Sequence, residues 1–310
     1  MANLRAGVIG IGAMGRHHVR VFREMDGVDL VAVAGAELGG DPARVAVAGE
    51  SAGGNLVTAL TLAAAGVHTL VEKPVAVDSA AGERMAKAFD DAGLVGAVGH
   101  IERYNPAIQE VRRRIADGQL GEVYQISTRR QGPFPARIAD VGVILDLASH
   151  DIDLTAWAAQ STYTTVSAQT SFRSGREHED MVLITGRLAN GVNVNHTVNW
   201  LSPMKERLTV VAGERGTLIA DTATADVTFY ENGRVQTEWD AVAAFRGVAE
   251  GDVTRYAIAK REPLRTELEA FRDAVLGGEN RTVSMAEGLA TLRVAEAAKR
   301  SAQTQETVRL

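Results

Sequence analysis

Short apolar runs alternate with segments of helical periodicity through the first hundred residues. In the helical segments, apolar side chains recur every three or four positions, as on one face of a helix. Strands that alternate with helices in this way predict a parallel, doubly wound sheet. The predicted strands are residues 5–9, 28–34, 45–48, 67–71 and 94–99, and the predicted helices are about 14–24, 55–65 and 79–91.

The pattern changes beyond about residue 120, where apolar and polar side chains alternate with the period of a half-buried strand. Asn190-Gly191 and Asn232-Gly233 have the composition of tight hairpin turns. We therefore expect an open antiparallel sheet, with helices at about 141–159, 264–277 and 285–302. The predicted strands of this sheet are residues 122–130, 163–172, 180–188, 191–200, 206–212 and 216–230.

These two patterns divide the chain near residue 101, after the last predicted parallel strand. The predicted fold class is α/β. Residues 1–101 form a shortened, Rossmann-like doubly wound parallel sheet, and residues 102–310 form an α/β domain with an open antiparallel sheet. The length of 310 residues is enough for each domain to bury a core of its own.

Composition excludes several classes of protein. A net charge of −6 argues against a cationic face for nucleic acid, so we expect no nucleic-acid partner. The absence of cysteine excludes thiol nucleophiles, thiolate zinc sites and disulfides, which fits a cytoplasmic chain. No apolar run is long enough to span a bilayer and no basic, export-type leader is present, so we expect no membrane partner.

A glycine-rich loop follows the first predicted strand and opens the first predicted helix. It reads Gly10-Ile11-Gly12-Ala13-Met14-Gly15. In a G-x-G-x-x-G loop the first glycine permits the tight turn, the second lets a pyrophosphate approach the backbone, and the third lets the helix pack on the strand. The pattern predicts a dinucleotide site, although a merely tight turn would use the same glycines.

The second predicted strand carries the residues that would choose between NAD and NADP. An acidic residue about twenty positions after the loop would bind the adenosine ribose of NAD. The strand ends in Gly35, and Glu37 is the nearest carboxylate. We expect NAD, and NADP stays possible.

Two groups of polar residues are candidates for the chemistry. Glu72-Lys73-Pro74 ends a predicted parallel strand on the edge where ligands bind in doubly wound sheets, and the X-Pro bond there has the character of a cis peptide. A solvated lysine in a turn is the alternative.

Asp146, His150 and Asp153 recur at i, i+4 and i+7 on one face of an otherwise apolar predicted helix. A carboxylate one turn from an imidazole can tune it as a general base, whereas a satisfied internal histidine is the structural alternative.

The glycine-rich loop, the Glu72-Lys73-Pro74 tripeptide and the Asp146-x-x-x-His150 pair together resemble the glucose-fructose oxidoreductase, inositol dehydrogenase and MocA family of nicotinamide-dependent sugar oxidoreductases. The resemblance covers about residues 1–34 and 66–310. It implies a Rossmann domain that binds NAD through Gly10, Gly12, Ala13, Met14, Gly15, Glu72 and Lys73. It also implies homo-oligomers, dimers or tetramers, formed through the sheet of the second domain.

The resemblance further assigns roles to the chemical residues. His150 would accept the proton of a sugar hydroxyl, Asp146 would orient His150, and Lys73 would stabilise the developing alkoxide while hydride leaves for the nicotinamide. The segments 99–106 and 132–138 look most similar to members that oxidise the 3-hydroxyl of UDP-N-acetylglucosamine. The polar residues that these segments would offer to such a substrate are Arg103, Tyr104, Asn105 and Arg137.

Residues 36–65 depart from the family pattern. Gly49-Glu50-Ser51-Ala52-Gly53 fits G-x-S-x-G, with a predicted strand before it and a helix after it, and resembles the nucleophile elbow of hormone-sensitive-lipase-like esterases. A serine esterase using Ser51 is therefore a second hypothesis, although no His-Gly-Gly oxyanion segment precedes it. The structural interpretation is a chimera, in which a strand-turn-helix from another α/β fold replaces the family's own segment. Its strand would lie beside strand 5–9, and one strand-helix unit at the edge of the sheet would be lost. An inactive scaffold is a third hypothesis.

Overall fold

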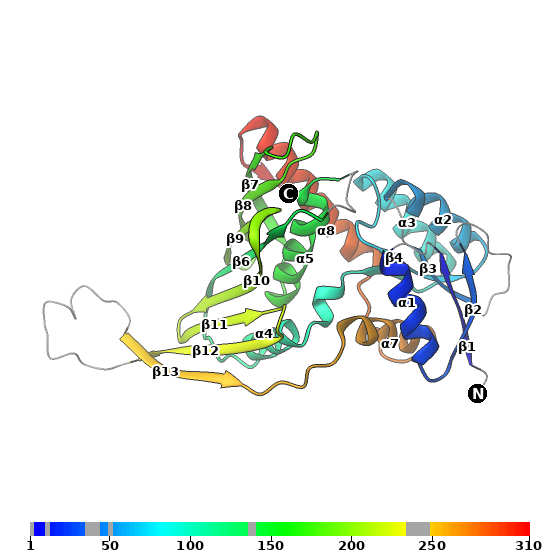
Figure 1. Ribbon diagram of the computed structural model, residues 1–310, viewed down its shortest axis with the longest axis horizontal. Helices are drawn as coiled ribbons and strands as arrows, with labels where there is room; N and C mark the ends of the chain where they lie inside the picture. The colour runs from blue at the N-terminus through cyan, green and yellow to red at the C-terminus, as the bar shows by residue number, and fades with distance from the viewer. Residues whose placement is uncertain (1–2, 10–12, 35–43, 49–51, 136–140, 234–248) are drawn as a thin grey trace, which may run out of the picture. The chain divides into compact units, whose positions relative to one another are not determined.

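The computed structural model describes residues 3–9, 13–34, 44–48, 52–135, 141–233 and 249–310. The chain forms two compact units (Figure 1). The first unit contains Met1–Tyr104 and Arg261–Glu296, and the second contains Asn105–Lys260 and Ala297–Leu310. The predicted division at residue 101 assigned Arg261–Glu296 to the second unit, whereas this segment belongs to the first. The periodicity of a helix does not show which sheet the helix packs on.

A five-stranded parallel sheet forms the first unit, in the order β2-β1-β3-β4-β5. The predicted parallel sheet is thus confirmed, and so is the expectation that strand 45–48 lies beside strand 5–9, since Arg5 to Ile9 pair with Arg44 to Ala48. The order reverses between β1 and β3, the switch point beside which ligands bind in such sheets. The strands are β1 (Leu4–Ile9), β2 (Val28–Ala34), β3 (Arg44–Ala48), β4 (His68–Glu72) and β5 (Gly96–Gly99).

Helices cover both faces of this sheet. On one face, α1 (Ala13–Glu24) and α7 (Pro263–Val275) bury Phe22 and Phe271 against β1, β2 and β4. On the other face, Leu62 of α2 (Ala52–Ala64) packs with Val67 and Ile9. Two more helices complete the unit, α3 (Ser79–Ala92) and the first part of α8 (Met285–Thr304).

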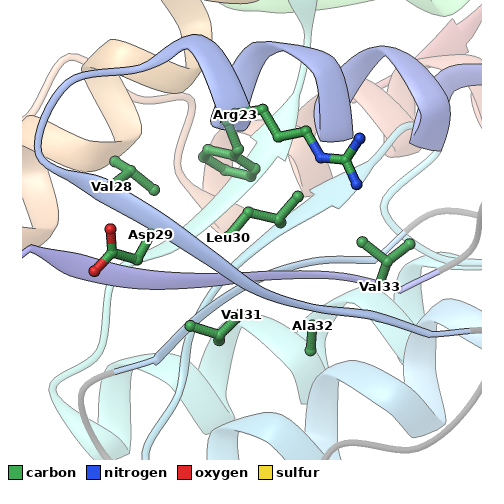
Figure 2. A pocket seen from close by; sticks show the side chains of 8 residues that line it. Arg23, Val28, Asp29, Leu30, Val31, Ala32 and Val33 are labelled. Carbon is green, nitrogen blue, oxygen red and sulfur yellow. The ribbon is translucent and has the colours of Figure 1, made fainter.

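Strand β2 lies at one edge of the sheet, where it lines a shallow pocket of about 380 Å³ (Figure 2). Val31 and Val33 on this edge are 44% and 43% exposed. Arg23 reaches from α1 over the strand. Lys73 follows β4, which lies three positions from β2 in the strand order, and Lys73 does not line this pocket.

The second unit contains a nine-stranded sheet in the order β13-β12-β11-β10-β6-β9-β8-β7-β14. The expectation of a purely antiparallel sheet is wrong at one place, because β6 and β9 pair in parallel. The helices α4 (Pro106–Ala116) and α5 (Ser149–Ala158) belong to this unit. Its strands are β6 (Val123–Pro133), β7 (Tyr163–Ser171), β8 (Met181–Leu188), β9 (Asn193–Asn199), β10 (Leu201–Gly213), β11 (Gly216–Asp221), β12 (Asp226–Gly233), β13 (Ala249–Tyr256) and β14 (Val308–Arg309).

One of the two predicted hairpin turns is confirmed and the other is wrong. Gly191 has a φ of 91° in the turn between β8 and β9. Asn232-Gly233 instead belongs to β12, where the two residues pair with Glu250 and Ala249. The predicted single strand 216–230 breaks at residues 222–225, because the Asp221 carboxylate accepts hydrogen bonds from the backbone of Ala223 and Thr224.

A buried polar network lies between the second sheet and α5. His196 is 1% exposed, and its ring nitrogens lie 2.7 Å from Thr128 Oγ1 and 2.8 Å from the Tyr163 hydroxyl. Burial, and then the charge of Arg130, lower the pKa of His196 from 6.5 to about 3. The imidazole is therefore neutral in the folded chain near neutral pH, and its two hydroxyl partners, which can each donate or accept, satisfy both ring nitrogens.

This low pKa predicts a loss of stability in acid. The unfolded chain binds a proton at His196 below about pH 6.5, whereas the folded chain binds it only near pH 3. Between these values the free energy of unfolding should fall by up to ~1.4 kcal/mol per pH unit from this group. Urea unfolding of the wild type and of His196→Gln at several pH values would measure how the free energy of unfolding changes with pH. The variant should show the smaller slope between pH 6.5 and 5, and equal slopes would contradict the assignment.

Candidate functional site

The first unit carries the elements that would hold a dinucleotide. Gly10, Ile11 and Gly12 lie outside the described residues, and so does Glu37. Helix α1 begins at Ala13 directly after the loop, with Met14 exposed and Gly15 buried. The first turn of α1 contains no acidic side chain, so no carboxylate of that turn offsets the positive end of the helix dipole. This helix start beside the switch point fits the pyrophosphate of NAD.

Lys73 follows β4 at the same carboxyl edge of the sheet, and the bond from Lys73 to Pro74 is cis, as expected. The preceding residue, Glu72, pairs in register with Gly99 of β5. Its carboxylate lies 2.7 Å from Nε2 of His18, a residue of α1 that is 1% exposed. The structure therefore brings together Lys73, Glu72 and a histidine that sequence reasoning missed. The one available signal was its position, three residues after Gly15.

Arg103 and Tyr104 also belong to the first unit, in a short 3₁₀ turn, Ile101–Tyr104. Arg103 is 7% exposed, and its guanidinium lies 2.6 Å from the Glu287 carboxylate. Burial opposes ionisation of Glu287, but the charge of Arg103 and hydrogen bonds from Arg103 and Ser284 outweigh it and lower the pKa of this carboxyl. The Tyr104 hydroxyl donates to the carbonyl of Arg281 at 3.1 Å. These contacts support the fold, and a role of the two residues in substrate binding stays a prediction.

Asn105 begins the second unit and caps α4, a helix that sequence reasoning missed. Its side-chain oxygen accepts from Ala107 N at 3.0 Å, and its amide nitrogen donates to the Thr222 carbonyl at 2.9 Å. Local contacts thus occupy both ends of this amide, which favours a structural role. Arg137 lies outside the described residues.

Asp146 and His150 lie on one continuous helical segment of the second unit. The expected helix 141–159 begins with a π turn, Ile144–Ala148, and continues as α5. The backbone N–H of Ser149 donates to the carbonyl of Ile144, five residues back, which defines the π turn. Asp146 and His150 are half-buried, and Asp153 is 1% exposed. Single π turns of this kind are frequent at functional sites.

The Glu179 side chain holds the start of this helical segment, and the next residue, Asp180, binds Arg173 and Ser174. The Glu179 carboxylate accepts from the backbone N–H of Ile144 at 3.0 Å, and a Cβ at Gly142 would lie 2.1 Å from that carboxylate. Burial opposes ionisation of Asp180, but hydrogen bonds from Arg173 and Ser174 outweigh it and hold the pKa below its usual value. Sequence reasoning missed this support, because residues far along the chain provide it.

An aromatic cluster adjoins the same support. The Arg176 guanidinium lies 4.6 Å from the centre of the Phe134 ring and 5.2 Å from that of Trp200. Arg176 also donates to the Val141 carbonyl at 2.8 Å, just before the helical segment. The candidate residues therefore form two groups. Lys73, Glu72 and the start of α1 belong to the first unit, and Asp146 and His150 belong to the second.

In the described part of the chain, no group of three or more His, Cys, Asp or Glu residues could hold a metal ion. Across the described helices, none is both long and apolar enough to cross a membrane.

Comparison with known proteins identifies two regions. Residues 108–219 match the family model described as the GFO/IDH/MocA C-terminal domain. Residues 23–89 match a model described as the alpha/beta hydrolase fold, over a range that contains the esterase-like segment.

Curated relatives match most of the chain. UDP-N-acetylglucosamine 3-dehydrogenase of Acidithiobacillus ferrooxidans is 28% identical, over 89% of this chain and 90% of that protein. Inositol 2-dehydrogenase 2 of Saccharopolyspora erythraea is 27% identical, over 98% of this chain and 94% of that protein. Its alignment spans 337 positions, more than the 310 residues here, so that relative contains stretches that this chain lacks.

Solved structures share the fold. The Acidithiobacillus ferrooxidans UDP-N-acetylglucosamine 3-dehydrogenase aligns with a TM-score of 0.81 at 23% identity, over 98% of this chain and 99% of that chain. The WlbA dehydrogenase of Bordetella pertussis, solved with NADH and UDP-GlcNAcA, aligns with a TM-score of 0.83 at 22% identity, over 100% and 98%.

Proposed function

We propose that the chain is an NAD-dependent oxidoreductase that acts on a secondary hydroxyl of a sugar or nucleotide sugar, because residues 108–219 match the GFO/IDH/MocA C-terminal domain and the similar relatives are dehydrogenases. The observation that carries the proposal is the position of Lys73. It lies at the carboxyl end of β4, on the sheet edge where α1 begins. The dehydrogenase relatives match the chain over nearly its whole length, which supports the same reaction class.

The chemistry follows from the side chains. NAD, when bound, accepts the hydride through its nicotinamide ring. A ring nitrogen of His150 accepts the hydroxyl proton of the sugar as general base. The Lys73 ammonium stabilises the negative charge that develops on that oxygen, and Asp146 orients the imidazole. The N–H groups at the start of α1 bind the pyrophosphate.

Within this class of substrates, the specific substrate that we propose is UDP-N-acetylglucosamine, oxidised at its 3-hydroxyl. Support comes from the relative that carries this activity in its name and from the structural neighbour solved with a UDP-sugar. The inositol dehydrogenase relatives favour a free polyol instead. Both substrates present a secondary hydroxyl, so the proposed roles of Lys73 and His150 hold for either.

Two measurements test the proposal. Calorimetric titration with NAD and NADP should give binding, with the higher affinity for NAD. Incubation with NAD and UDP-N-acetylglucosamine, UDP-glucose or myo-inositol should then produce NADH, fastest with UDP-N-acetylglucosamine. NADH from myo-inositol alone would correct the substrate and keep the reaction class. Absence of both NAD binding and NADH would contradict the proposal and leave the inactive scaffold.

The hydrolase-like region provides a second candidate function, a serine esterase. Its support is the match of residues 23–89 to the alpha/beta hydrolase fold. Ser51, its nucleophile, lies outside the described residues. A fluorophosphonate probe should leave Ser51 unlabelled if the dehydrogenase proposal is right. Labelling of the wild type that is lost in Ser51→Ala would favour the esterase.

The oligomer forms part of the proposal as well. The face of the second sheet opposite α5 carries partly exposed apolar side chains, among them Leu183 at 41% and Tyr230 at 45%. A second copy would bury this face. Light scattering should give a multiple of the 32.9 kDa chain mass, and Leu183→Asp should lower it. A wild type that scatters as a single chain would contradict this assembly.

A further inference from the structure

His18 lies inside the first unit, in contact with the residue that precedes Lys73. Its side chain is 1% exposed, and Nε2 lies 2.7 Å from Glu72 Oε1. An ionised carboxylate can only accept, so Nε2 is the donor of this hydrogen bond. A charge-assisted bond to a buried donor is among the stronger side-chain contacts, and it fixes the carboxylate in one place.

The Glu72 carboxylate also lies close to Gly99 of β5. A Cβ at position 99 would lie 3.0 Å from the Glu72 carboxyl carbon and 3.0 to 3.1 Å from its oxygens. The absence of a side chain at Gly99 therefore leaves the space that the carboxylate occupies. The Glu72 carboxylate thus has two close neighbours, the His18 imidazole and Gly99, and both restrict the positions that it can take.

The hydrogen bond between His18 and Glu72 connects parts of the sheet that are not neighbours in the strand order. Strand β3 lies between β1 and β4, and α1 follows β1. The hydrogen bond from α1 to Glu72 thus joins two strand ends that do not pair with each other. Strand β3 lies within the region that matches the hydrolase fold. The contact spans the one strand whose sequence departs from the oxidoreductase pattern.

We propose that His18 is a positioning residue, which acts through Glu72 to fix the end of β4 and thereby places Lys73 relative to the helix that follows the glycine-rich loop. The role of Lys73 rests on the proposed function. A shift of about 1 Å in a catalytic group can cost on the order of a hundredfold in rate. A histidine that only fills space in the core would instead affect stability without affecting the reaction selectively.

Three variants separate these roles. His18→Leu fills the volume and removes the donor, whereas His18→Gln keeps a nitrogen donor at a similar reach. His17→Leu is the matched control, because His17 is the exposed neighbour on the same helix. We expect His18→Leu to lower kcat by roughly ten- to a hundredfold with little change in the KM for the sugar, and His18→Gln to recover most of kcat. The control should match the wild type.

Gly99→Ala provides an independent variant, because it displaces the Glu72 carboxylate and leaves His18 unchanged. We expect it to lower kcat as His18→Leu does, and the double variant to be little worse than either single one. Additive losses in the double variant would overturn a role of His18 through Glu72. Equal losses of kcat in His18→Leu and His18→Gln would overturn it too.

Hydrogen exchange provides a readout that does not depend on activity. In His18→Leu, the amides of residues 70–75 should exchange faster than in the wild type, while peptides of the second unit stay unchanged. His18→Gln and His17→Leu should show the wild-type rates. If the wild type forms no NADH, the proposed function fails and this measurement still decides the role of His18. Unchanged exchange at residues 70–75 in His18→Leu overturns it.

Discussion

Replacing His150 with alanine should lower kcat by about a hundred- to ten-thousandfold, the range for loss of a general base. The affinity for NAD should stay the same, because the residues proposed to bind NAD belong to the first unit and His150 belongs to the second. Stopped-flow or steady-state formation of NADH measures kcat, and calorimetry measures the affinity. His17→Ala, an exposed histidine outside the proposed site, is the control and should keep full turnover.

The dependence on pH makes this test specific. Loss of a base should remove the acidic limb of the kcat/KM profile in His150→Ala, whereas a packing defect would lower the whole profile evenly. Asp146→Asn should retain more turnover than His150→Ala and should shift that limb to lower pH, because the imidazolium loses its negative partner. Unchanged turnover in His150→Ala would remove the residue from the mechanism, whatever the effect at Asp146.

Sequence predicted those parts of the fold that rest on local chemistry. The strands and helices of the first unit have short apolar runs and clear helical periods, and the five-stranded parallel sheet follows. The place of strand 45–48 beside strand 5–9 was also predictable, because a right-handed strand-turn-helix can fill only a few positions in such a sheet. Proline at position 74 made a cis bond possible, and the structure contains it.

Contacts between distant segments were not predictable from one sequence. The periodicity of Arg261–Glu296 shows a helix but not the sheet that it covers. Asn232-Gly233 has the composition of a turn, yet pairing with β13 keeps it in a strand. The parallel pairing of β6 and β9 depends on the order in which nonadjacent strands join the sheet, which their alternating pattern does not encode.

The candidate site shows the same limit. The strand end before Lys73 and the helical segment that carries Asp146 and His150 were predictable from local patterns, and the catalytic roles of the three residues stay predictions. The residues around them were not predictable, since His18 and Glu179 make contacts 54 and 35 positions away along the chain. Arg103 and Asn105 have side chains suited to a phosphate and also form an ion pair and a helix cap, while their role in substrate binding stays a prediction. Residue type alone does not separate these uses.

Replacing Arg130 with methionine should lower the free energy of unfolding of the second unit by about 3–5 kcal/mol. Arg130 is 4% exposed and Asp151 is 2% exposed, and Arg130 Nε lies 2.9 Å from Asp151 Oδ1. Methionine retains most of the arginine volume, so the loss comes from the buried carboxylate whose cationic partner is gone. All three tryptophans lie between residues 105 and 260, so tryptophan fluorescence during urea unfolding reports on this unit.

The neighbouring residue supplies the control. Arg129 lies on the opposite face of β6 with its side chain 54% exposed, 3.2 Å from Glu206, and an exposed pair contributes about 1 kcal/mol or less. Arg129→Met should therefore change stability little, while Arg130→Met with Asp151→Leu should recover most of the loss by removing both charges. Because the charge of Arg130 also lowers the pKa of His196, Arg130→Met should weaken the acid sensitivity that His196 causes. If Arg129→Met and Arg130→Met lower the free energy of unfolding equally, the buried ion pair contributes no more to stability than the exposed one.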